Sequence, residues 1–475
     1  MRAENTERDT CFQEFLNNEL PDGWAHAKLP QITEITMGQS PPGSSYNKQG
    51  EGLPFFQGKA DFGDRSPKVR VWCTQPKKIA KPGDVLISVR APVGPTNMAD
   101  KTCAIGRGLV AITPLGGIPT EFILFALRLL EPELALSGTG STFTAINRKN
   151  LEDIDINVPP LAEQKRIVAK VEELFARVNT VRERLKKVSA ILKRFHQSVL
   201  AAACNGRLTA EWREQQIDLD SASILLEQIH QKHHRWGKTD PPEDNLPDIP
   251  ENWIWATVGQ LGDVTTGNTP SKKESAYFGG SIPFFKPADL DACYYVETSI
   301  DSLTEEGAKV ARILPPLAVM VTCIGATIGK TGLARVAGAT NQQINSLITD
   351  HEFISPYWLF WAFTSPWVQE QIKLRASETT LPILNKGRFS MLPLPLPPLS
   401  EQYEIVRRVE ALFNLADNIE KRVTATMIRA EKLTPAILAK AFRGEIVPTE
   451  AELAKREGRE YESASTLLAR IKAER

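Results

Sequence analysis

The most regular pattern of apolar and polar positions lies in two long stretches, beginning near Glu163 and Glu401. Apolar residues recur there at alternating spacings of four and three, which is typical of a coiled-coil seam. The first seam contains Ile167, Val171, Leu174, Val178, Val181, Leu185, Val188, Leu192, Phe195 and Val199. The second contains Ile405, Val409, Leu412, Ala416, Ile419, Val423, Thr426, Ala430, Leu433 and Ile437. We expect two long helices that pair with each other.

The second seam is weaker, because Ala416, Thr426 and Ala430 offer little apolar surface. Pro435 is expected to kink or end the second helix. The first helix, from Glu163 to Ala203, should be about 60 Å long at a rise of about 1.5 Å per residue. The alternative is that each stripe packs only on its own domain.

The chain contains an internal repeat. The run PPLAEQKRIVAKVEELF from Pro159 returns as PPLSEQYEIVRRVEALF from Pro397, with 11 of 17 positions identical. Upstream, Trp24, Gly38, Pro41 and the triplet Pro54-Phe55-Phe56 match Trp253, Gly267, Pro270 and Pro283-Phe284-Phe285. Downstream, SASILLEQI from Ser221 matches SASTLLARI from Ser463. The alternative explanation of this repeat is a duplicated domain without functional meaning.

Each half begins with a module of short β-rich runs, such as DVLISVR from Asp84 and LAVMVTCIG from Leu317. Clusters of Gly, Pro, Ser and Asn separate these runs, and a Pro-Pro pair precedes each long helix. The sequence therefore predicts an α+β protein with two globular domains, separated by an antiparallel pair of coiled-coil helices and related by a pseudo-twofold repeat.

Composition describes an ordinary soluble protein of two domains. The chain has 475 residues, 42% of them hydrophobic, and 57 basic residues balance 57 acidic ones. Its six cysteines lie far apart without metal-binding spacing, so we expect reduced thiols, no disulfide and no zinc. The most apolar stretch, Ile313 to Ile328, is interrupted by Pro315 and Pro316. We expect a cytoplasmic protein without membrane contact.

Local charge suggests where nucleic acid would bind. Between Lys59 and Arg107 ten basic residues stand against four acidic ones, whereas between Lys286 and Asp350 seven acidic residues outnumber five basic ones. Cations contact phosphates, and Asn and Gln read adenine. The candidate DNA-binding residues are Lys59, Arg65, Lys68, Arg70, Arg90, Lys101, Arg107, Lys286, Lys330, Arg335, Asn341, Gln342 and Gln343. A solvated face without a ligand is the alternative.

An antiparallel helix pair would suit duplex DNA. It would place the two modules about an approximate twofold axis that matches the local dyad of DNA. The first helix would exceed one DNA turn of ~34–36 Å. Because the modules differ in sequence, they should read two different half-sites around an unread spacer whose length the helices set.

Motifs for catalysis are missing from the sequence. We find no Asn-Pro-Pro-aromatic methyl-transfer motif, no nuclease carboxylate cluster and no deaminase arrangement. GATIGKT, from Gly325 to Thr331, is one residue short of a phosphate-binding loop and is predicted to be a strand-to-turn element. The GTG at Gly138 is equally weak, and the histidines near His233 are expected to be solvated linker residues. The open alternatives are an enzyme with unrecognised motifs and a scaffold that does not read DNA.

The repeated unit resembles the specificity subunits of Type I restriction–modification systems. The motif PLPPLxEQxxIVxxVExLF, the long helix and SAxxLLxRI carry this resemblance, which runs from about Leu20 to the C-terminus. It implies an N-terminal extension (1–19), recognition domains (20–160 and 250–398), conserved helical regions (161–210 and 399–447), a linker (211–249) and a C-terminal repeat of that linker (448–475).

The resemblance also implies what the chain works with. Double-stranded DNA, two modification subunits that methylate adenine with S-adenosylmethionine, and restriction subunits that use ATP and Mg would be its partners. It implies that this chain is not an enzyme and binds none of these cofactors itself.

Overall fold

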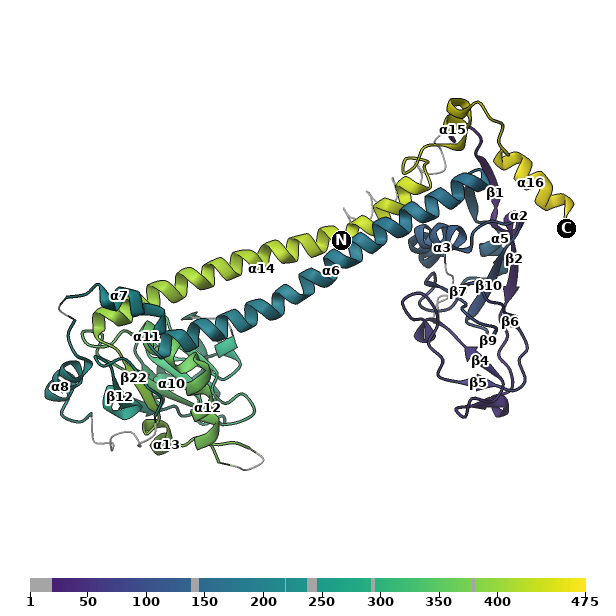
Figure 1. Cartoon of the computed structure of the whole chain (residues 1–475). Helices are drawn as coiled ribbons and strands as arrows, with labels where there is room; N and C mark the ends of the chain where they lie inside the picture. The colour runs from purple at the N-terminus through teal and green to yellow at the C-terminus, as the bar shows by residue number, and fades with distance from the viewer. Residues whose placement is uncertain (1–18, 138–144, 218, 237–245, 292–294, 378–380) are drawn as a thin grey trace. The chain divides into compact units, whose positions relative to one another are not determined.

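The structure, a computed structural model, describes residues 19–137, 145–217, 219–236, 246–291, 295–377 and 381–475. The chain divides into two compact units (Figure 1). Unit 1 comprises residues 1–185 and 425–475, and unit 2 comprises residues 186–424. Apart from Glu19, the expected N-terminal extension lies outside the described residues, as does the GTG sequence at Gly138.

Unit 1 contains an antiparallel sheet in the order β2-β10-β7-β8 and a mixed sheet in the order β3-β5-β4-β9-β6. A pair of strands, β1 and β11, joins the two ends of the module. The strands are β1 (Ala25–Lys28), β2 (Thr33–Met37), β3 (Tyr46–Asn47), β4 (Leu53–Phe56), β5 (Trp72–Cys73), β6 (Ile79–Ala80), β7 (Val85–Ser88), β8 (Thr96–Met98), β9 (Cys103–Ile105), β10 (Leu109–Pro114) and β11 (Asp155–Val158). The helices are α2 (Leu29–Ile32), α3 (Thr120–Leu129), α4 (Glu131–Ser137) and α5 (Arg148–Glu152).

Unit 2 repeats this plan with the sheet orders β13-β21-β18-β19-β15 and β16-β14-β20-β17, and with β12 paired to β22. The strands are β12 (Ile254–Thr257), β13 (Asp263–Thr266), β14 (Phe278–Phe285), β15 (Tyr295–Val296), β16 (Asp301–Leu303), β17 (Ile313–Leu314), β18 (Val319–Thr322), β19 (Thr331–Ala334), β20 (Gly338–Thr340), β21 (Ile344–Ile348) and β22 (Pro393–Leu396). The helices are α9 (Val258–Leu261), α10 (Glu305–Val310), α11 (Pro356–Thr364), α12 (Pro366–Arg375) and α13 (Lys386–Ser390).

Strand register shows how closely the two units correspond. β4 pairs parallel to β9 with Phe55 opposite Ala104, and β14 pairs parallel to β20 with Phe284 opposite Ala339. The central strands β10 and β21 each pair antiparallel to a strand on both sides. These observations confirm the α+β class and the internal repeat.

Local sequence explains the buried elements of each core. Leu109–Ile112 of β10 are fully buried, as expected for an apolar run in the middle of a sheet. α11 is apolar around its whole circumference and is buried except at Tyr357 and Thr364. Ser355 begins α11, because its side chain accepts a hydrogen bond from the backbone N–H of Trp358.

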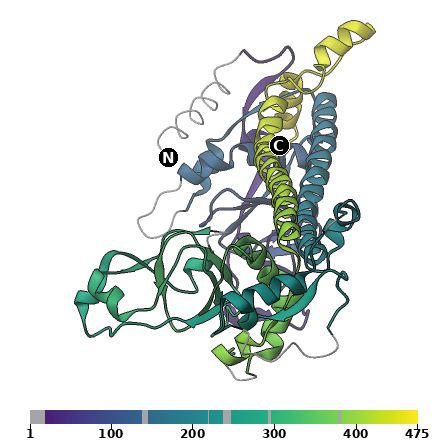
Figure 2. The ribbon, with the colours of Figure 1, turned by 90° about the vertical axis from the view of Figure 1, so that its left-hand side faces the viewer.

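The two long helices are α6 (Leu161–Cys204) and α14 (Leu399–Ala441), which lie side by side in Figures 1 and 2. In unit 1, Ile167 near the start of α6 shares a core with Leu438 near the end of α14. In unit 2, Val199 near the end of α6 shares a core with Ile405 near the start of α14. The pairing is therefore antiparallel within each unit.

The predicted seam describes α6 better than α14. Val181, Ile419 and Leu433 are 43%, 37% and 48% exposed, so their assignment to a buried seam was wrong. Thr426, a seam position of the sequence pattern, is also exposed. The remaining seam positions of both helices are buried or half-buried.

Towards its C-terminus the inward face of α14 shifts by one residue from the predicted register. Met427 and Thr434 are more buried than Thr426 and Leu433, and Leu438 is only 2% exposed. Pro435 lies inside the helix and does not end it, so that part of the expectation was wrong. Proline cannot donate a backbone hydrogen bond, but the shifted stripe begins before Pro435, at Met427, and continues beyond it to Leu438.

Short helices after each long helix complete the units. They are α7 (Ala210–Glu214) and α8 (Ala222–Lys232) in unit 2, and α15 (Glu450–Glu457) and α16 (Ala464–Ala473) in unit 1. α8 buries Ile229 and α16 buries Leu467 and Ile471, so the repeated SAS motif begins an equivalent packing helix in each unit. Each module is thus covered by a segment that follows the other module in the chain.

The apolar stretch from Ile313 to Ile328 forms β17, β18 and a turn. Within the described residues, no helix has both the length and the apolar character needed to cross a bilayer. Cys73, Cys103, Cys204 and Cys323 are buried free thiols, and Cys11 and Cys293 lie outside the described ranges. Burial raises the pKa of Cys103, Cys204 and Cys323 to about 12, which keeps these thiols protonated at neutral pH.

Candidate nucleic-acid interface

Three of the candidate cations in unit 1 line one pocket of about 230 Å³. Lys59 follows β4, Arg90 follows β7 and Arg107 lies in the turn between β9 and β10. Since β4 and β9 are parallel neighbours, their carboxyl ends meet at the same edge of the sheet. The fold thereby gathers residues that are up to 48 positions apart in the sequence.

The pocket is positively charged. No acidic residue lines it, and within the described part of the chain Lys59, Arg90 and Arg107 have no carboxylate at ion-pair distance. All three side chains belong to exposed residues. Unpaired guanidinium and ammonium groups bind phosphate oxygens or the acceptor edge of guanine.

A second hollow of about 790 Å³ adjoins the pocket and shares Gln57, Gly58, Lys59 and Ala91 with it. Its further lining includes the apolar side chains of Phe55, Val71 and Pro92. We refer to the two adjoining hollows as one groove, with cations at one end and, at the other, apolar side chains beside the carboxylate of Asp61. Such a surface suits a nucleic acid, which carries both phosphates and flat bases.

The remaining candidates of unit 1 lie outside this groove. Arg65 pairs with Glu121 at 3.0 Å and with Glu172 at 3.2 Å, and Lys101 pairs with Asp100 at 3.5 Å. These partners reduce the charge available to a phosphate. Lys68 and Arg70 are exposed, but they do not line the groove.

In unit 2 the candidate amides occupy the turn that corresponds to the Arg107 turn. Asn341 is 7% exposed, and its side chain hydrogen-bonds Gln343, so it stabilises the turn. Gln343 also donates to the carbonyl of Ile324 at 3.5 Å. Gln342 is exposed at the tip of the turn and is the amide of this group best placed to meet a ligand.

The candidate cations of unit 2 are engaged within the protein. Lys286 pairs with Asp301 and lies over the ring of Phe284. Arg335 pairs with Glu297. Lys330 is half-buried beside α12, in a cavity of about 980 Å³. Lys286, Arg335 and Gln342 do not line this cavity.

Ser40 and Thr269 are functional candidates that sequence reasoning missed. The hydroxyl oxygen of Ser40 accepts a hydrogen bond from the backbone N–H of Arg107 at 3.3 Å. Thr269 donates a hydrogen bond to the side-chain oxygen of Gln342 at 2.5 Å. The repeat contained a signal for both residues. Ser40 lies between the matched residues Gly38 and Pro41, and Thr269 lies at the same place between their counterparts in the second copy.

The sequence GATIGKT does not form a phosphate-binding loop. Gly325 to Lys330 make a turn that leads into strand β19, whereas a phosphate-binding loop leads into the N-terminus of a helix. The strand-to-turn prediction is confirmed. His233 also differs from expectation, because it pairs with Asp350 at 2.8 Å and stacks on Trp236 rather than being solvated.

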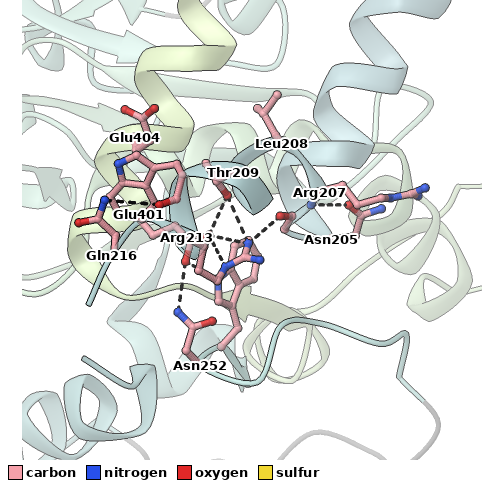
Figure 3. Close-up of polar contacts among 12 residues, drawn as sticks. Asn205, Arg207, Leu208, Thr209, Arg213, Gln216, Asn252, Glu401 and Glu404 are labelled. Carbon is pink, nitrogen blue, oxygen red and sulfur yellow. Dashed lines mark hydrogen bonds and ion pairs between the residues drawn. The ribbon is translucent and has the colours of Figure 1, made fainter. Parts of the chain in front are cut away.

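The repeated PPLxEQ motif forms a buried polar contact in each unit. Glu401 is fully buried and accepts hydrogen bonds from Thr209 and Arg213 (Figure 3). It also accepts a hydrogen bond from the ring N–H of Trp253 at 2.8 Å. Glu163 is its counterpart and accepts from the ring N–H of Trp24 at 3.0 Å. The motif thus ties the start of each long helix to the first strand region of its own module.

The partners of the two carboxylates differ beyond the tryptophan. Arg213 neutralises Glu401 at 2.7 Å, whereas Glu163 accepts from the backbone N–H of Glu450 at 2.8 Å, at the first turn of α15. Burial raises the pKa of Glu163, and the hydrogen bonds oppose that rise. Both contacts also hold a segment that belongs to the other copy of the repeat.

Comparison with known proteins agrees with this organisation. The chain matches the family model described as the Type I restriction modification DNA specificity domain over residues 21–190 and 250–426. It is 31% identical over 465 residues to the specificity subunit of the Type I restriction enzyme EcoDI of Escherichia coli, with 96% of each chain covered. Its identity to the EcoBI specificity subunit of the same species is 28%, covering 96% of this chain and 93% of that one.

Solved structures share the fold. An HsdS subunit from Thermoanaerobacter tengcongensis superposes with a TM-score of 0.60 at 20% identity, covering 91% of this chain and 100% of that one. A chain from a study of complex assembly and conformational transition of the type I R-M system gives a TM-score of 0.62 at 20% identity. That match covers 90% of this chain and 100% of the other.

Proposed function

The chain belongs to the family of Type I restriction–modification DNA specificity subunits, and on this premise we propose that it recognises a bipartite, asymmetric DNA target. Members of this family are non-catalytic and supply sequence-specific DNA recognition to a restriction–modification complex. In the proposal, residues 20–160 and 250–398 are the target-recognition domains, and each reads one half-site. Residues 161–210 and 399–447 are the conserved helical regions.

One observation carries the proposal of two different half-sites. Equivalent turns of the two units present different chemistry on the same backbone framework: Arg107 in unit 1 and Gln342 in unit 2. Arg90 similarly has an apolar counterpart, Ile324, since each forms an isolated bridge just beyond the equivalent strand. Two modules with one framework and two recognition surfaces suit a target whose halves differ.

The helices are proposed to fix the length of the unread spacer. Their antiparallel pairing within each unit is what a twofold arrangement of readers on duplex DNA requires. α6 continues without interruption for 44 residues and contributes residues to both units, which supports this role. Spacer length would then depend on the helices and not on either module.

Partner subunits are proposed to carry out the chemistry. Two modification subunits would bind S-adenosylmethionine and methylate adenine at the target, and restriction subunits would use ATP and Mg for translocation and cleavage. Family membership supports this proposal, as does the naming of the relatives as subunits of restriction enzymes. The complex would act on DNA in the cytoplasm.

Exchange of one module tests the proposal. Residues 20–160 are replaced by the corresponding module of a relative, and the methylated sites are mapped by methylome sequencing of cells that also express the modification subunit. We expect one half-site of the methylated sequence to change, while the other half-site and the spacer stay the same. Methylation without sequence preference in the unmodified system would favour a scaffold that does not read DNA.

A further inference from the structure

We infer that Arg107 and Gln342 are equivalent base-reading residues, with Arg107 selecting a guanine in one half-site and Gln342 an adenine in the other. This inference rests on the proposed function and adds the residues and bases that distinguish the two halves. If the inference holds, replacing either side chain by the other changes the preferred base at one position of the target.

Backbone contacts establish the equivalence of the two positions. The residue before Arg107 donates its N–H to the carbonyl of Phe56 at 2.8 Å, and the residue before Gln342 donates to Phe285 at 3.1 Å. In both turns a further hydrogen bond closes the loop, from Leu109 to Gly106 at 3.0 Å and from Ile344 to Asn341 at 3.2 Å. The two side chains therefore leave the framework from the same point.

A hydroxyl group from an earlier loop of the same unit forms a hydrogen bond with Arg107 and with Gln342. Gly38 and Gly267 donate to Leu109 and Ile344 at 3.0 and 3.1 Å, which places the residues that follow them beside the turn. Ser40 then accepts from the backbone of Arg107. Its counterpart Thr269 donates to the Gln342 side chain and fixes the orientation of that amide, leaving the NH₂ group free to donate.

The chemistry of the two side chains differs in a way that matches bases better than phosphates. A guanidinium donates two parallel hydrogen bonds to O6 and N7 of guanine, and a carboxamide both donates and accepts at N7 and N6 of adenine. A phosphate contact shared by both units would not account for the change from a cation at Arg107 to a neutral amide at Gln342, whereas different bases in the two half-sites do. In unit 1, Lys59 and Arg90 flank Arg107 and supply charge for the phosphates.

The decisive variant is Arg107→Gln, with the reciprocal Gln342→Arg. Purified complexes with the modification subunit are titrated with duplexes that carry the mapped target or a single-base substitution of it, at low ionic strength so that phosphate contacts keep the DNA bound. The parent should discriminate about ten- to a hundredfold at one guanine of the first half-site. Arg107→Gln should lose that preference in favour of adenine, and no other position should change.

Arg70→Gln serves as the matched control, because Arg70 is exposed and lies outside the groove. It should weaken binding to every duplex by the same factor or leave binding unchanged. Thermal unfolding of both variants should match the parent, since both side chains are exposed.

Three outcomes would overturn the inference: unchanged discrimination in Arg107→Gln, changes at several positions, or loss of all binding, which a single base contact cannot cause. Failure of the proposed function has a different signature. In that case the parent complex itself shows no preference among the duplexes, whatever residue stands at position 107.

Discussion

At the scale of single residues, a buried carboxylate connects each long helix to its module. Glu401 lies at 0% exposure, and Trp253, Thr209 and Arg213 direct donors towards its two oxygens. A buried charge is tolerated only when its hydrogen bonds and counter-charge are complete. The junction between α14 and its module therefore depends on the glutamate of the repeated PPLxEQ motif.

Replacing this carboxylate should strongly destabilise unit 2. Glu401→Gln leaves the Arg213 cation without a counter-charge and places an NH₂ group against several donors, so we expect a loss of about 3–5 kcal/mol. Glu214→Gln, an exposed change on the neighbouring α7, should alter stability by less than about 0.5 kcal/mol. Urea unfolding followed by tryptophan fluorescence measures both, and equal stability of the two variants would contradict the account.

Glu404, one turn further along α14, should make stability depend on acid pH. Hydrogen bonds from Arg407, followed by Arg408, lower the pKa of this carboxyl to about 2. A lowered pKa in the folded state means that the ion pairs stabilise the protein above the ordinary glutamate range, near 4.5. Their contribution is lost as the pH falls from there towards 2.

The measurement is the difference in unfolding free energy between the parent and Glu404→Gln from pH 7 to pH 3. This difference should be greatest above pH 5 and should decrease below pH 4. Glu420→Gln, at an exposed position of the same helix, should give a small difference that does not vary with pH. A constant difference for Glu404→Gln would show that its ion pairs do not contribute in this way.

Residue roles were the least predictable property from sequence. Charge counting identified Lys59, Arg90 and Arg107, but it gave no means of separating them from Arg65, whose charge is paired to Glu121 and Glu172. That separation depends on contacts between segments that are 56 and 107 residues apart. Local sequence does not indicate contacts between such distant segments. Only the folded structure therefore distinguishes the paired cation Arg65 from the three cations of the pocket.

At the scale of elements, the sequence predicted the long helices well because their pattern is strictly local. Seam spacing and the Pro-Pro boundaries placed α6 and α14 to within a few residues. The inward face of α14 beyond Val423 was less predictable, since small residues there leave the stripe with little apolar signal. Within unit 1, Thr434 is more buried than the predicted seam residue Leu433, and Leu438 is more buried than Ile437.

This register shift predicts a contrast between two leucines of α14. Leu438→Ala removes a side chain from the core of unit 1 and should lower stability by about 2–5 kcal/mol. Leu433→Ala removes one that is 48% exposed and should change stability by less than about 1 kcal/mol. Thermal unfolding midpoints of the two variants compare them directly, and a larger loss for Leu433→Ala would restore the register expected from sequence.

For the molecule as a whole, the two copies of the repeat do not fold as two separate units that follow one another along the chain. The segment after the first long helix, with α7 and α8, belongs to unit 2, and the segment after the second, with α15 and α16, belongs to unit 1. Each unit is therefore built from both copies, and neither module is complete without residues from the other half of the chain. This exchange gives a physical reason for the two halves to act as one protein.

We propose that the paired helices set the distance between two independent recognition domains. It is tested most directly by a methylation map of a variant with one heptad inserted into α6 after Leu185 and one into α14 after Thr424, at the boundaries between the units. Seven residues add about 10 Å, equivalent to about three base pairs. We expect a spacer lengthened by up to that amount between unchanged half-sites, whereas altered half-sites or an unchanged spacer would show that the helices do not set it.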